Sequence, residues 1–576
     1  MSQPLQEPQY FAATDWQQIM GRDSFVERDA LARAQALLDP GSMRVLLGPF
    51  DRLESPWLPL QGIVPQSDDG VIIARGMIDS RPAVIASIEQ RFQGGATGEV
   101  SGAKISQALT LAAEESRRGT RTAAVILFET GGVRLQEANL GLNAVAEICS
   151  AVLDLRRLAP VIGVVAGTVG SFGGVSIAAG LCSQLIVTPE ARIGLNGPAV
   201  IEQEGGVEEF DSSDKALIWA IDGGEQRFST GLADKLVLDD AAEIRAAVSA
   251  AVAAPSARPA THRSERLDVL SSRLAVIDPS DPPQPHDLRT IWGATYEPVS
   301  GRRFARPAPA EPAVSRGATW LRLLGGEPTA LIPSVLRADT ADATYLAVVP
   351  DPHNPFHRAR EGQLGLTESL ALAQAVRAVC GADDDQPASD KRAIVAIVDL
   401  PSQAYGRIEE MAGLHQAIAA AVDAYHAARV AGHPVIALVV GRALSGGFLA
   451  HGLQANQILA LDDPGVEIHA MHKPAAARIT QRTVEELDEL AKTVKPLSYA
   501  VRDWAELGFC DGLLTVSDAD APTEADRKVV SEAITGAIDR ARTSPTDLSN
   551  RMTSSAAVVS RAASIEVRER LARQWT

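Results

Sequence analysis

The sequence is poor in aromatic residues and in cysteine. Phe, Trp and Tyr together make up 4% of its 576 residues, so the hydrophobic cores must be built mainly from Ala, Val, Ile and Leu. The four cysteines lie far apart in the chain, at Cys149, Cys182, Cys380 and Cys510. This spacing predicts neither a zinc ribbon nor a dense disulfide framework, since both need closely spaced cysteines.

Positive charge is also in deficit. The chain has 54 Lys and Arg residues against 72 Asp and Glu residues, which gives a formal net charge of −18. Binding to nucleic acid or to an anionic membrane requires a basic surface, so this balance argues against both. Local basic pockets for a small anion are still compatible with it.

The N-terminal residues lack the basic start and apolar stretch of a secretory signal. One segment, Ala159–Val187, carries no charge, but it contains Pro160 and six glycines. Such a composition suits a strand, a turn and a buried helix better than a membrane-spanning helix. We therefore expect a cytoplasmic protein without a membrane association.

The length predicts several domains, and proline marks the main boundary. At roughly 150 residues per domain, 576 residues correspond to three or four domains or to two large ones. Ten of the 34 prolines fall between Pro255 and Pro312, where continuous helix or central strand is disfavoured. We predict a domain over residues 1–254, an extended connection over 255–312, and a second domain over 313–576.

The two predicted domains share one pattern of apolar strands and Ala-rich helical segments, typical of α/β units. The spacings between matching residues also agree. In each half, two matching residues are 40 positions apart, and a third lies 19 positions further on, at Ile193 in the first half and Val466 in the second. The two residues 40 positions apart are Arg134 and Gly174 in the first half, and Arg407 and Gly447 in the second. We infer an internal duplication of about 250 residues.

Glycine pairs follow apolar strands in both halves. The segments SFGG and SGGF open helices, where amide groups have no partner within the helix and the helix dipole is positive. The turns ETGGVR and SQAYGR supply a second set of amides, so that two N–H groups can form an oxyanion hole. The alternative, tight turns and close packing only, is less favoured when four such sites share a register. The candidates are Gly131, Gly132, Gly173 and Gly174, and in the second half Tyr405, Gly406, Gly446 and Gly447.

Other chemistry finds little support in the sequence. No dinucleotide-binding glycine motif, phosphate-binding loop or serine-hydrolase elbow occurs. His469 and His472 are three residues apart but have no nearby third ligand, so no metal site is predicted. Glu137 and Glu410 occupy matching places in the repeat, which favours a structural role for both.

These motifs carry a family resemblance. The segments FQGGATGEVSGAKI, ETGGVRLQEA and VGSFGGVSIAAG resemble the carboxyltransferase branch of the crotonase-like superfamily. Within it, the first half resembles the beta subunit of biotin-independent malonate decarboxylase. The second half, with VDLPSQAYGRIEE and GRALSGGFLAHGLQAN, resembles the gamma subunit. The resemblance implies a beta–gamma fusion with two crotonase-like α/β domains of repeated ββα units, facing each other across the active site.

The resemblance also implies an activity, which is decarboxylation of a malonyl thioester on an acyl carrier protein to the acetyl thioester. Its partners would be that carrier, with a prosthetic group derived from dephospho-CoA, and a carrier-transferase alpha subunit. No biotin, no metal and no covalently bound cofactor are expected on this chain. Two alternatives are a biotin-dependent acyl-CoA carboxyltransferase and a non-catalytic scaffold that docks the carrier.

Under this reading, the enolate oxygen meets the amides of Gly132 or Gly131 and of Gly174 or Gly173. The second-half motifs face the departing carboxylate. Tyr405, ordered water or His451 would supply the proton, although His451 is more simply a core histidine. Gly94, Gly95, Arg91 and Lys104 lie in or beside the glycine-rich segment, where the basic pair binds a CoA-like arm or forms a solvated basic face.

Overall fold

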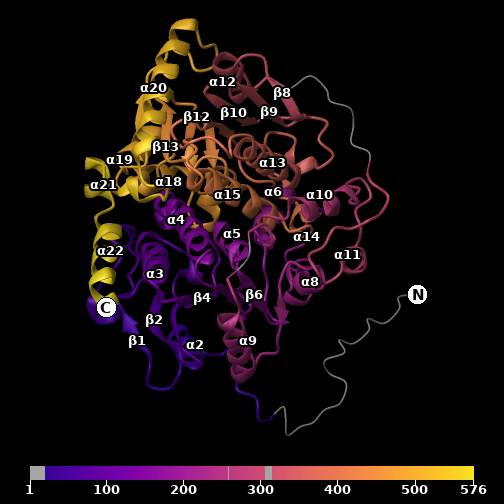
Figure 1. The fold of residues 1–576 in the computed structure, drawn as a ribbon, viewed down its shortest axis with the longest axis vertical. Helices are drawn as coiled ribbons and strands as arrows, with labels where there is room; N and C mark the ends of the chain where they lie inside the picture. The colour runs from indigo at the N-terminus through magenta and orange to yellow at the C-terminus, as the bar shows by residue number, and fades with distance from the viewer. Residues whose placement is uncertain (1–19, 257–258, 305–313) are drawn as a thin grey trace.

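The computed structural model describes residues 20–256, 259–304 and 314–576. Each half of the chain contains one mixed β-sheet with helices packed around it (Figure 1). The first sheet has the spatial order β1 (Arg44–Leu46), β2 (Val71–Ile78), β3 (Arg81–Ile88), β4 (Ala123–Phe128), β5 (Val161–Val165), β6 (Gln184–Val187) and β7 (Lys235–Leu236). The second has the order β15 (Gly512–Leu514), β13 (Gln457–Leu461), β12 (Val435–Leu444), β11 (Ala393–Leu400), β10 (Ala343–Val348), β9 (Val335–Asp339) and β8 (Thr329–Ile332), with β14 (Ile468–His469) beside β12.

The two sheets repeat one design, as the matched spacings in the sequence indicate. In each sheet the first three strands pair antiparallel. The strands that follow them pair parallel. All six residues of β4 are buried, as expected for a parallel strand covered on both faces. The α/β fold class predicted from the sequence is confirmed.

Helices connect the strands and form the contact between the halves. Those of the first half are α2 (Ala30–Leu37), α3 (Glu99–Arg117), α4 (Ala138–Arg156), α5 (Gly174–Leu181), α6 (Pro198–Gly205), α7 (Lys215–Asp222), α8 (Gly224–Ser229) and α9 (Ala241–Ala253). Those of the second half are α12 (Arg316–Gly325), α13 (Leu366–Ala382), α14 (Arg407–Met411), α15 (Leu414–Val430), α16 (Ser445–Ala450), α17 (Lys473–Ile479), α18 (Val484–Ala491), α19 (Val501–Glu506), α20 (Glu524–Thr543), α21 (Ser555–Ser560) and α22 (Ala562–Trp575).

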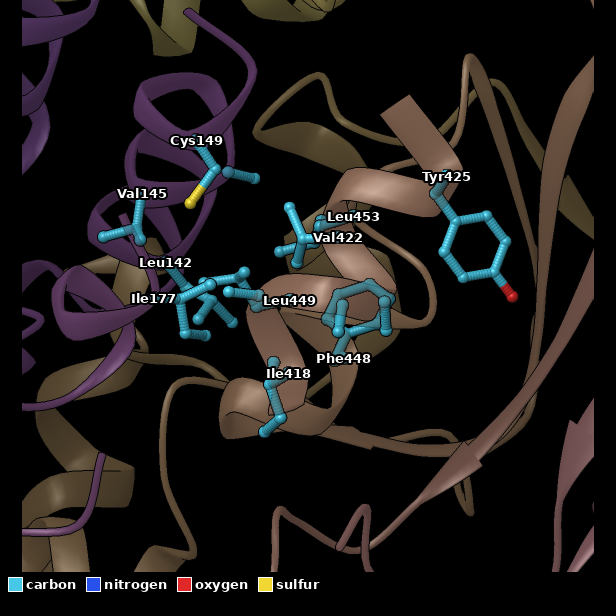
Figure 2. Close-up of a cluster of buried hydrophobic side chains, with 14 of the residues drawn as sticks. Leu142, Val145, Cys149, Ile177, Ile418, Val422, Tyr425, Phe448, Leu449 and Leu453 are labelled. Atoms are coloured by element: carbon cyan, nitrogen blue, oxygen red, sulfur yellow. The ribbon is translucent and has the colours of Figure 1, made fainter. Parts of the chain in front are cut away.

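The two halves meet through α4 and α5 on one side and α15 and α16 on the other. Figure 2 shows buried hydrophobic side chains at this contact, and the labelled ones are each at most 3% exposed. Because aromatic residues are scarce, branched aliphatic side chains and alanines provide most of the buried area. The cluster comprises Leu142, Val145 and Cys149 of α4, Ile177 of α5, Ile418 and Val422 of α15, Phe448 and Leu449 of α16, and Leu453.

The connection between the halves is more ordered than its prolines predict. It contains two helices, α10 (Leu267–Ala275) and α11 (Pro285–Trp292), so the prediction of an extended segment was wrong there. The residues just before α10 and within it include no proline. Pro285 occupies the first turn of α11, where the helix needs no amide donor. The predicted boundary at 312–313 lies outside the described residues.

The connection is also bound to both halves. Arg156 of α4 donates to Ser264 Oγ at 3.2 Å and to Asp423 Oδ2 of α15 at 2.6 Å. Ser264 donates to the same carboxylate. His262 contacts the carbonyl oxygen of Cys182 at 2.8 Å. The connection therefore helps to hold the two halves together.

The uncharged segment folds as the sequence indicates. Residues 159–187 form β5, α5 and β6, a strand, a turn, a buried helix and a further strand. One helical stretch among the described residues, Leu135–Arg156, is long and apolar enough to cross a membrane, but 94% of it is buried within the protein. Its apolar surface packs in the contact between the halves.

The C-terminal helices return to the first half. In Figure 1, α22 lies beside α3 of the first half, away from the second sheet. Arg561 and Arg568 each donate to the Glu147 carboxylate of α4 at 2.7 Å, and Ser564 donates to Glu99 at 3.0 Å. Burial alone raises the pKa of Glu147, but the two guanidinium groups outweigh it and lower the pKa to about 2. This C-terminal strap ties the halves together.

Replacing Glu147 by Gln should destabilise the protein by about 3 kcal/mol at pH 7, because two buried guanidinium groups lose their counter-charge. The folded-state pKa of Glu147 lies below its ordinary value of 4.5, so its stabilisation is present above that pH and disappears as the pH falls towards 2. Denaturant unfolding at pH 7 and at pH 3 should therefore show the difference between wild type and variant shrinking at acid pH. Glu532→Gln, at a carboxylate with 69% exposure, is the control. Equal losses at both pH values would contradict this role.

Candidate active site

A cavity of about 370 Å³ lies between the halves at the ends of their strands. None of its lining residues carries a charged side chain, and Tyr405 is the only one with an ionisable group. The cavity thus offers backbone amides, carboxamides, hydroxyls and apolar surface. The lining comprises Gln93, Gly94, Ala96, Gly131, Val133, Leu135, Gln136, Leu142, Gly173, Gly174, Leu195, Asn196, Gly197, Val200, Gln403, Tyr405, Ser445, Gly446, Ala470, Met471 and Ile479.

Two first-half loops meet at the cavity through a pair of glycines. Gly132 has φ +113° and Gly173 has φ +60°, both in the region that favours glycine. A Cβ atom added to Gly173 would lie 2.8 Å from the Cα atom of Gly132, so the backbones touch directly. The predicted glycine pairs are therefore required for close approach, whatever else they do.

Three of the four predicted first-half amides already have acceptors. The amide of Gly131 donates to Gly94 O at 3.0 Å, that of Gly132 to Thr130 Oγ1 at 3.0 Å, and that of Gly173 to Leu195 O at 2.9 Å. They are not available to a ligand in this conformation.

The amides of Gly174 and Val133 donate to no acceptor among the described residues, and both residues line the cavity. Gly174 is the first residue of α5, where a helix has no internal acceptor for its amide. Val133 was missed from the sequence, because its contribution is a backbone group and its side chain carries no chemical signal. Its position directly after the Gly–Gly pair is the one indication that could have pointed to it.

The second-half face of the cavity is built from side chains. Gln403 Oε1 accepts the amide of Gly446 at 2.8 Å, and Gln403 Nε2 donates to Asn196 Oδ1 at 2.7 Å. The hydroxyls of Tyr405 and Ser445 lie 3.3 Å apart. The amide of Gly446 is thus occupied, as is that of Gly173, the residue at the matching position of the first half.

The predicted glycines Gly406 and Gly447 of the second half do not line the cavity, and neither does Gly132 of the first half. Gly406 is the N-cap of α14, and a Cβ atom there would meet the Glu409 carboxylate at 1.8 Å. Gly447 lies within α16 against Ser402, whose carbonyl oxygen would be 2.8 Å from an added Cβ atom. Both allow tight packing behind the cavity wall.

Glu410 holds a first-half loop in place from the second half. Its carboxylate accepts the amides of Leu195 at 2.9 Å and Asn196 at 2.7 Å. Burial raises the pKa of Glu410 to about 7, against the lowering effect of Arg227. Because Asn196 in turn contacts Gln403, Glu410 positions two of the polar groups in the cavity from outside it.

Glu137 has a similar structural place in the first half. Arg134 donates to its carboxylate at 2.7 Å, and Ser55 donates to its other oxygen at 2.6 Å. The carboxylate is fully buried and does not line the cavity. Both matched glutamates thus stabilise loops, as their positions in the repeat indicate.

Lys104 stabilises the fold from the interior, so the prediction that it binds the phosphates of a CoA-like arm was wrong. Its side chain is fully buried, and Nζ donates to the carbonyl oxygens of Leu47, Asp68 and Val71. Burial lowers its pKa to about 8. The capped ammonium group has no path to a ligand.

Of the other predicted substrate-binding residues, one lines the cavity and two lie outside it. Gly94 lines the cavity, whereas Gly95 does not and abuts Glu129 O, 1.9 Å from an added Cβ atom. Arg91 is exposed and borders a separate surface groove beside Phe50. A direct role in the cavity is therefore restricted to Gly94.

His451 is enclosed in the second-half core. Its Nδ1 atom contacts Tyr425 OH at 2.7 Å and its Nε2 atom the carbonyl oxygen of Ile397 at 3.3 Å. Burial lowers its pKa to about 4, so the ring is neutral. It does not line the cavity, which matches the core-histidine alternative and removes it as a direct proton donor.

His469 and His472, the two histidines three residues apart, each lie near a tyrosine ring. His469 stacks on Tyr499 with ring centroids 3.9 Å apart, and its Nδ1 atom is 3.0 Å from the carbonyl oxygen of Met471. Within residues 20–256, 259–304 and 314–576, no group of three His, Cys, Asp or Glu side chains is placed to hold a metal ion. These rings support the loop that carries Met471 into the cavity wall.

Two family matches divide the chain between them. The carboxyl transferase domain matches residues 27–303, and the malonate decarboxylase gamma subunit matches residues 359–575. A malonyl-S-ACP:biotin-protein carboxyltransferase, MADC of Malonomonas rubra, is 35% identical over 288 residues, covering 48% of this chain and 90% of the relative. The chain belongs to the carboxyltransferase family.

Two further relatives each match part of the chain. MADD of Malonomonas rubra, also a malonyl-S-ACP:biotin-protein carboxyltransferase, is 42% identical over 133 residues, covering 23% of this chain and 46% of that protein. A chain of a Pseudomonas malonate decarboxylase hetero-tetramer in complex with malonate is 55% identical, covering 48% of this chain and 99% of the other, with a TM-score of 0.47. The order of the two family matches confirms the beta–gamma fusion.

Gly174 allows a direct test of the free amide, because proline is tolerated at the first position of a helix and has no N–H group. We expect Gly174→Pro to lower turnover about 10²-fold or more relative to Gly174→Ala, the scale of losing one oxyanion donor. The alanine variant is the matched control. Any Cβ atom at this position crowds Leu449 at 2.9 Å and Val145 at 3.3 Å, but alanine keeps the amide.

The rates of both variants should be compared at equal folded fraction, measured by circular dichroism. Equal rates for the proline and alanine variants would show that the Gly174 amide does not contact the reacting group. The search for an oxyanion donor should then move to Val133.

Proposed function

We propose that this chain decarboxylates a malonyl thioester carried by an acyl carrier protein and releases the acetyl thioester. The observation that carries the proposal is the uncharged cavity between the halves, with the amides of Val133 and Gly174 open to it. The match to the malonate decarboxylase gamma subunit supports the same activity.

In the proposed reaction, the bond between the α-carbon and the carboxyl carbon breaks and CO₂ leaves. The bonding electrons form an enolate whose charge lies largely on the thioester oxygen. Two fixed N–H groups in a water-poor cavity stabilise such an oxyanion without a metal or a covalent nucleophile. An uncharged wall also avoids an ion pair that would stabilise the substrate carboxylate and oppose loss of its charge.

The enolate then takes up one proton at the α-carbon. Tyr405 is the ionisable group on the cavity wall, and burial raises its pKa above the ordinary value, so the phenol stays protonated at neutral pH. We propose that Tyr405 delivers this proton and is reprotonated from water. The balance is one malonyl thioester and one proton converted to one acetyl thioester and one CO₂.

The proposed partners are the carrier protein, with its dephospho-CoA-derived arm, and a separate transferase that loads malonate onto it. The name of the MADC relative, which specifies a malonyl-S-ACP substrate, supports a carrier-bound thioester. The chain is proposed to hold no biotin.

The second candidate function is transfer of the carboxyl group to a biotin protein, as the names of the MADC and MADD relatives state for those proteins. Transfer to a urea nitrogen develops negative charge on a second oxygen, which needs a second set of donors. At the start of α16, the amide of Gly446 is occupied by Gln403, and Gly447, which matches Gly174 in the repeat, does not line the cavity. Both observations favour decarboxylation.

A mixing assay separates these functions. Purified chain and malonyl thioester should release CO₂ and form acetyl thioester in equal amounts, and excess avidin should leave the rate unchanged because no biotin takes part. If avidin abolishes turnover, carboxyl transfer is the function. If neither condition gives turnover with the malonyl carrier or with malonyl-CoA, the non-catalytic scaffold is favoured.

Tyr405→Phe should lower the rate of acetyl thioester formation by about 10²-fold or more, the typical contribution of a positioned proton donor. Because the pKa of Tyr405 is raised, the wild-type rate should not fall between pH 7 and pH 9 on account of this residue. The matched control is Tyr425→Phe, a buried tyrosine of the same half that contacts His451 outside the cavity. That control should change stability more than rate. A Tyr405→Phe enzyme with near wild-type turnover would indicate that water delivers the proton.

A further inference from the structure

Ser445 adopts a backbone conformation that serine disfavours. It has φ +58° at the turn from β12 into α16, in the left-handed region that favours glycine. It is 3% exposed and lines the cavity. Strained backbone of this kind persists where the surrounding structure imposes it, and it concentrates at functional sites.

The internal duplication supplies a comparison. At the turn that leads into α5 in the first half, the residue with a similar angle is Gly173, with φ +60°; the spacing of the repeat aligns it with Gly446, one position after Ser445. The first half thus has a glycine at this φ, whereas the second half has a serine there although the next residue is a glycine. A serine that costs stability in the backbone is explained if its hydroxyl group has a task.

The hydroxyl of Ser445 is placed for a ligand. Its hydrogen-bond contact among the described residues is with Tyr405 OH, at a long 3.3 Å. These two hydroxyls are the only ones on the cavity wall, and they lie on the second-half face, away from the first-half amides. Each hydroxyl has a single O–H to donate, so both can point to a group inside the cavity when their long mutual contact is given up.

We propose that Ser445, together with Tyr405, binds the carboxylate of the malonyl group and determines the preference for malonyl over acetyl thioesters. The proposal rests on the proposed function. A carboxylate has two oxygens, which two neighbouring hydroxyls can each meet with one hydrogen bond. With the thioester oxygen on the amides of Val133 and Gly174, the malonyl group spans the cavity from the first half to the second.

Neutral donors suit this carboxylate better than a cation does. They orient it without neutralising it, so the charge moves to the enolate as CO₂ leaves. The Tyr405 O–H group, which first faces the carboxylate, then lies beside the α-carbon that needs a proton. Ser445 is thus a specificity residue that also positions the proposed donor.

Two variants separate the hydroxyl from the backbone. Ser445→Ala removes the hydroxyl and keeps the strain, whereas Ser445→Gly removes both. Both should lower the preference for the malonyl over the acetyl thioester at least about tenfold, because a hydrogen bond to a charged group is lost. Ser445→Gly should in addition raise the unfolding temperature.

Ser80→Gly is the matched control. Ser80 has φ +60° in an exposed turn between β2 and β3, outside the cavity. Its substitution should raise the unfolding temperature and leave the thioester preference unchanged. The preference is measured as the ratio of dissociation constants for malonyl-CoA and acetyl-CoA by calorimetry, and as kcat/KM where turnover occurs.

The outcomes distinguish this inference from the proposed function. Wild-type turnover with an unchanged preference in Ser445→Gly overturns the role of Ser445 and leaves the decarboxylase standing. A Ser445-dependent preference for malonyl-CoA without turnover supports the carboxylate site and overturns the decarboxylase. Equal weakening of both thioesters in both variants indicates a structural role and overturns the proposal.

Discussion

The contact between the two halves is the constraint on which the site depends. Helices α4 and α5 pack on α15 and α16 through hydrophobic side chains (Figure 2). The cavity is lined by residues at the starts of α5 and α16, Gly174 and Ser445 among them. Gly174 belongs to both features. Its amide is open to the cavity, while a Cβ atom on its Cα would press on Leu449 across the contact. Any change in how the halves pack therefore moves a proposed catalytic group.

Charged groups and neutral groups have separate tasks in this protein. Ion pairs and buried charges hold the frame: Glu147 fixes the C-terminal strap, Glu410 holds the loop of Leu195 and Asn196, and Lys104 caps three carbonyl oxygens. The cavity wall carries none of these charges. A reaction that moves one negative charge from a carboxylate to an enolate is helped by fixed dipoles aimed at its final position. A fixed cation near its initial position would oppose it.

The sequence predicts repeated, local features of the fold well. Strands Ala123–Phe128 and Ala393–Val398 are predicted from continuous apolar runs; the first forms β4 with these bounds, and the second lies within β11, which extends to Leu400. The two short helices of the connection were missed, because proline density over 255–312 hides the proline-free stretch that forms α10. Proline excludes a helix only where it stands beyond the first turn.

The site was predicted less completely, for physical reasons. Gly131 and Gly173 line the cavity and Gly132 lies against Gly173, but a sequence does not show which of their amides already have acceptors. Contacts such as Gln403 with Asn196 join residues that are 207 positions apart. Lys104 lies beside a glycine-rich segment, yet the fold turns it into the core. Local pattern gives the backbone shape, whereas occupancy of each polar group depends on the tertiary structure.

Duplication followed by divergence gives the site its asymmetry. The matched glycines Gly173 and Gly446 both have occupied amides, which donate to Leu195 O in the first half and to Gln403 Oε1 in the second. The next matched pair differs, because Gly174 lines the cavity and Gly447 does not. The backbone differs as well, since a φ near +60° occurs at Gly173 in one half and at Ser445, one position earlier in the repeat, in the other. An open amide on one face and a hydroxyl on the other would let the site distinguish the two ends of a malonyl group, which is what a single-substrate decarboxylation requires.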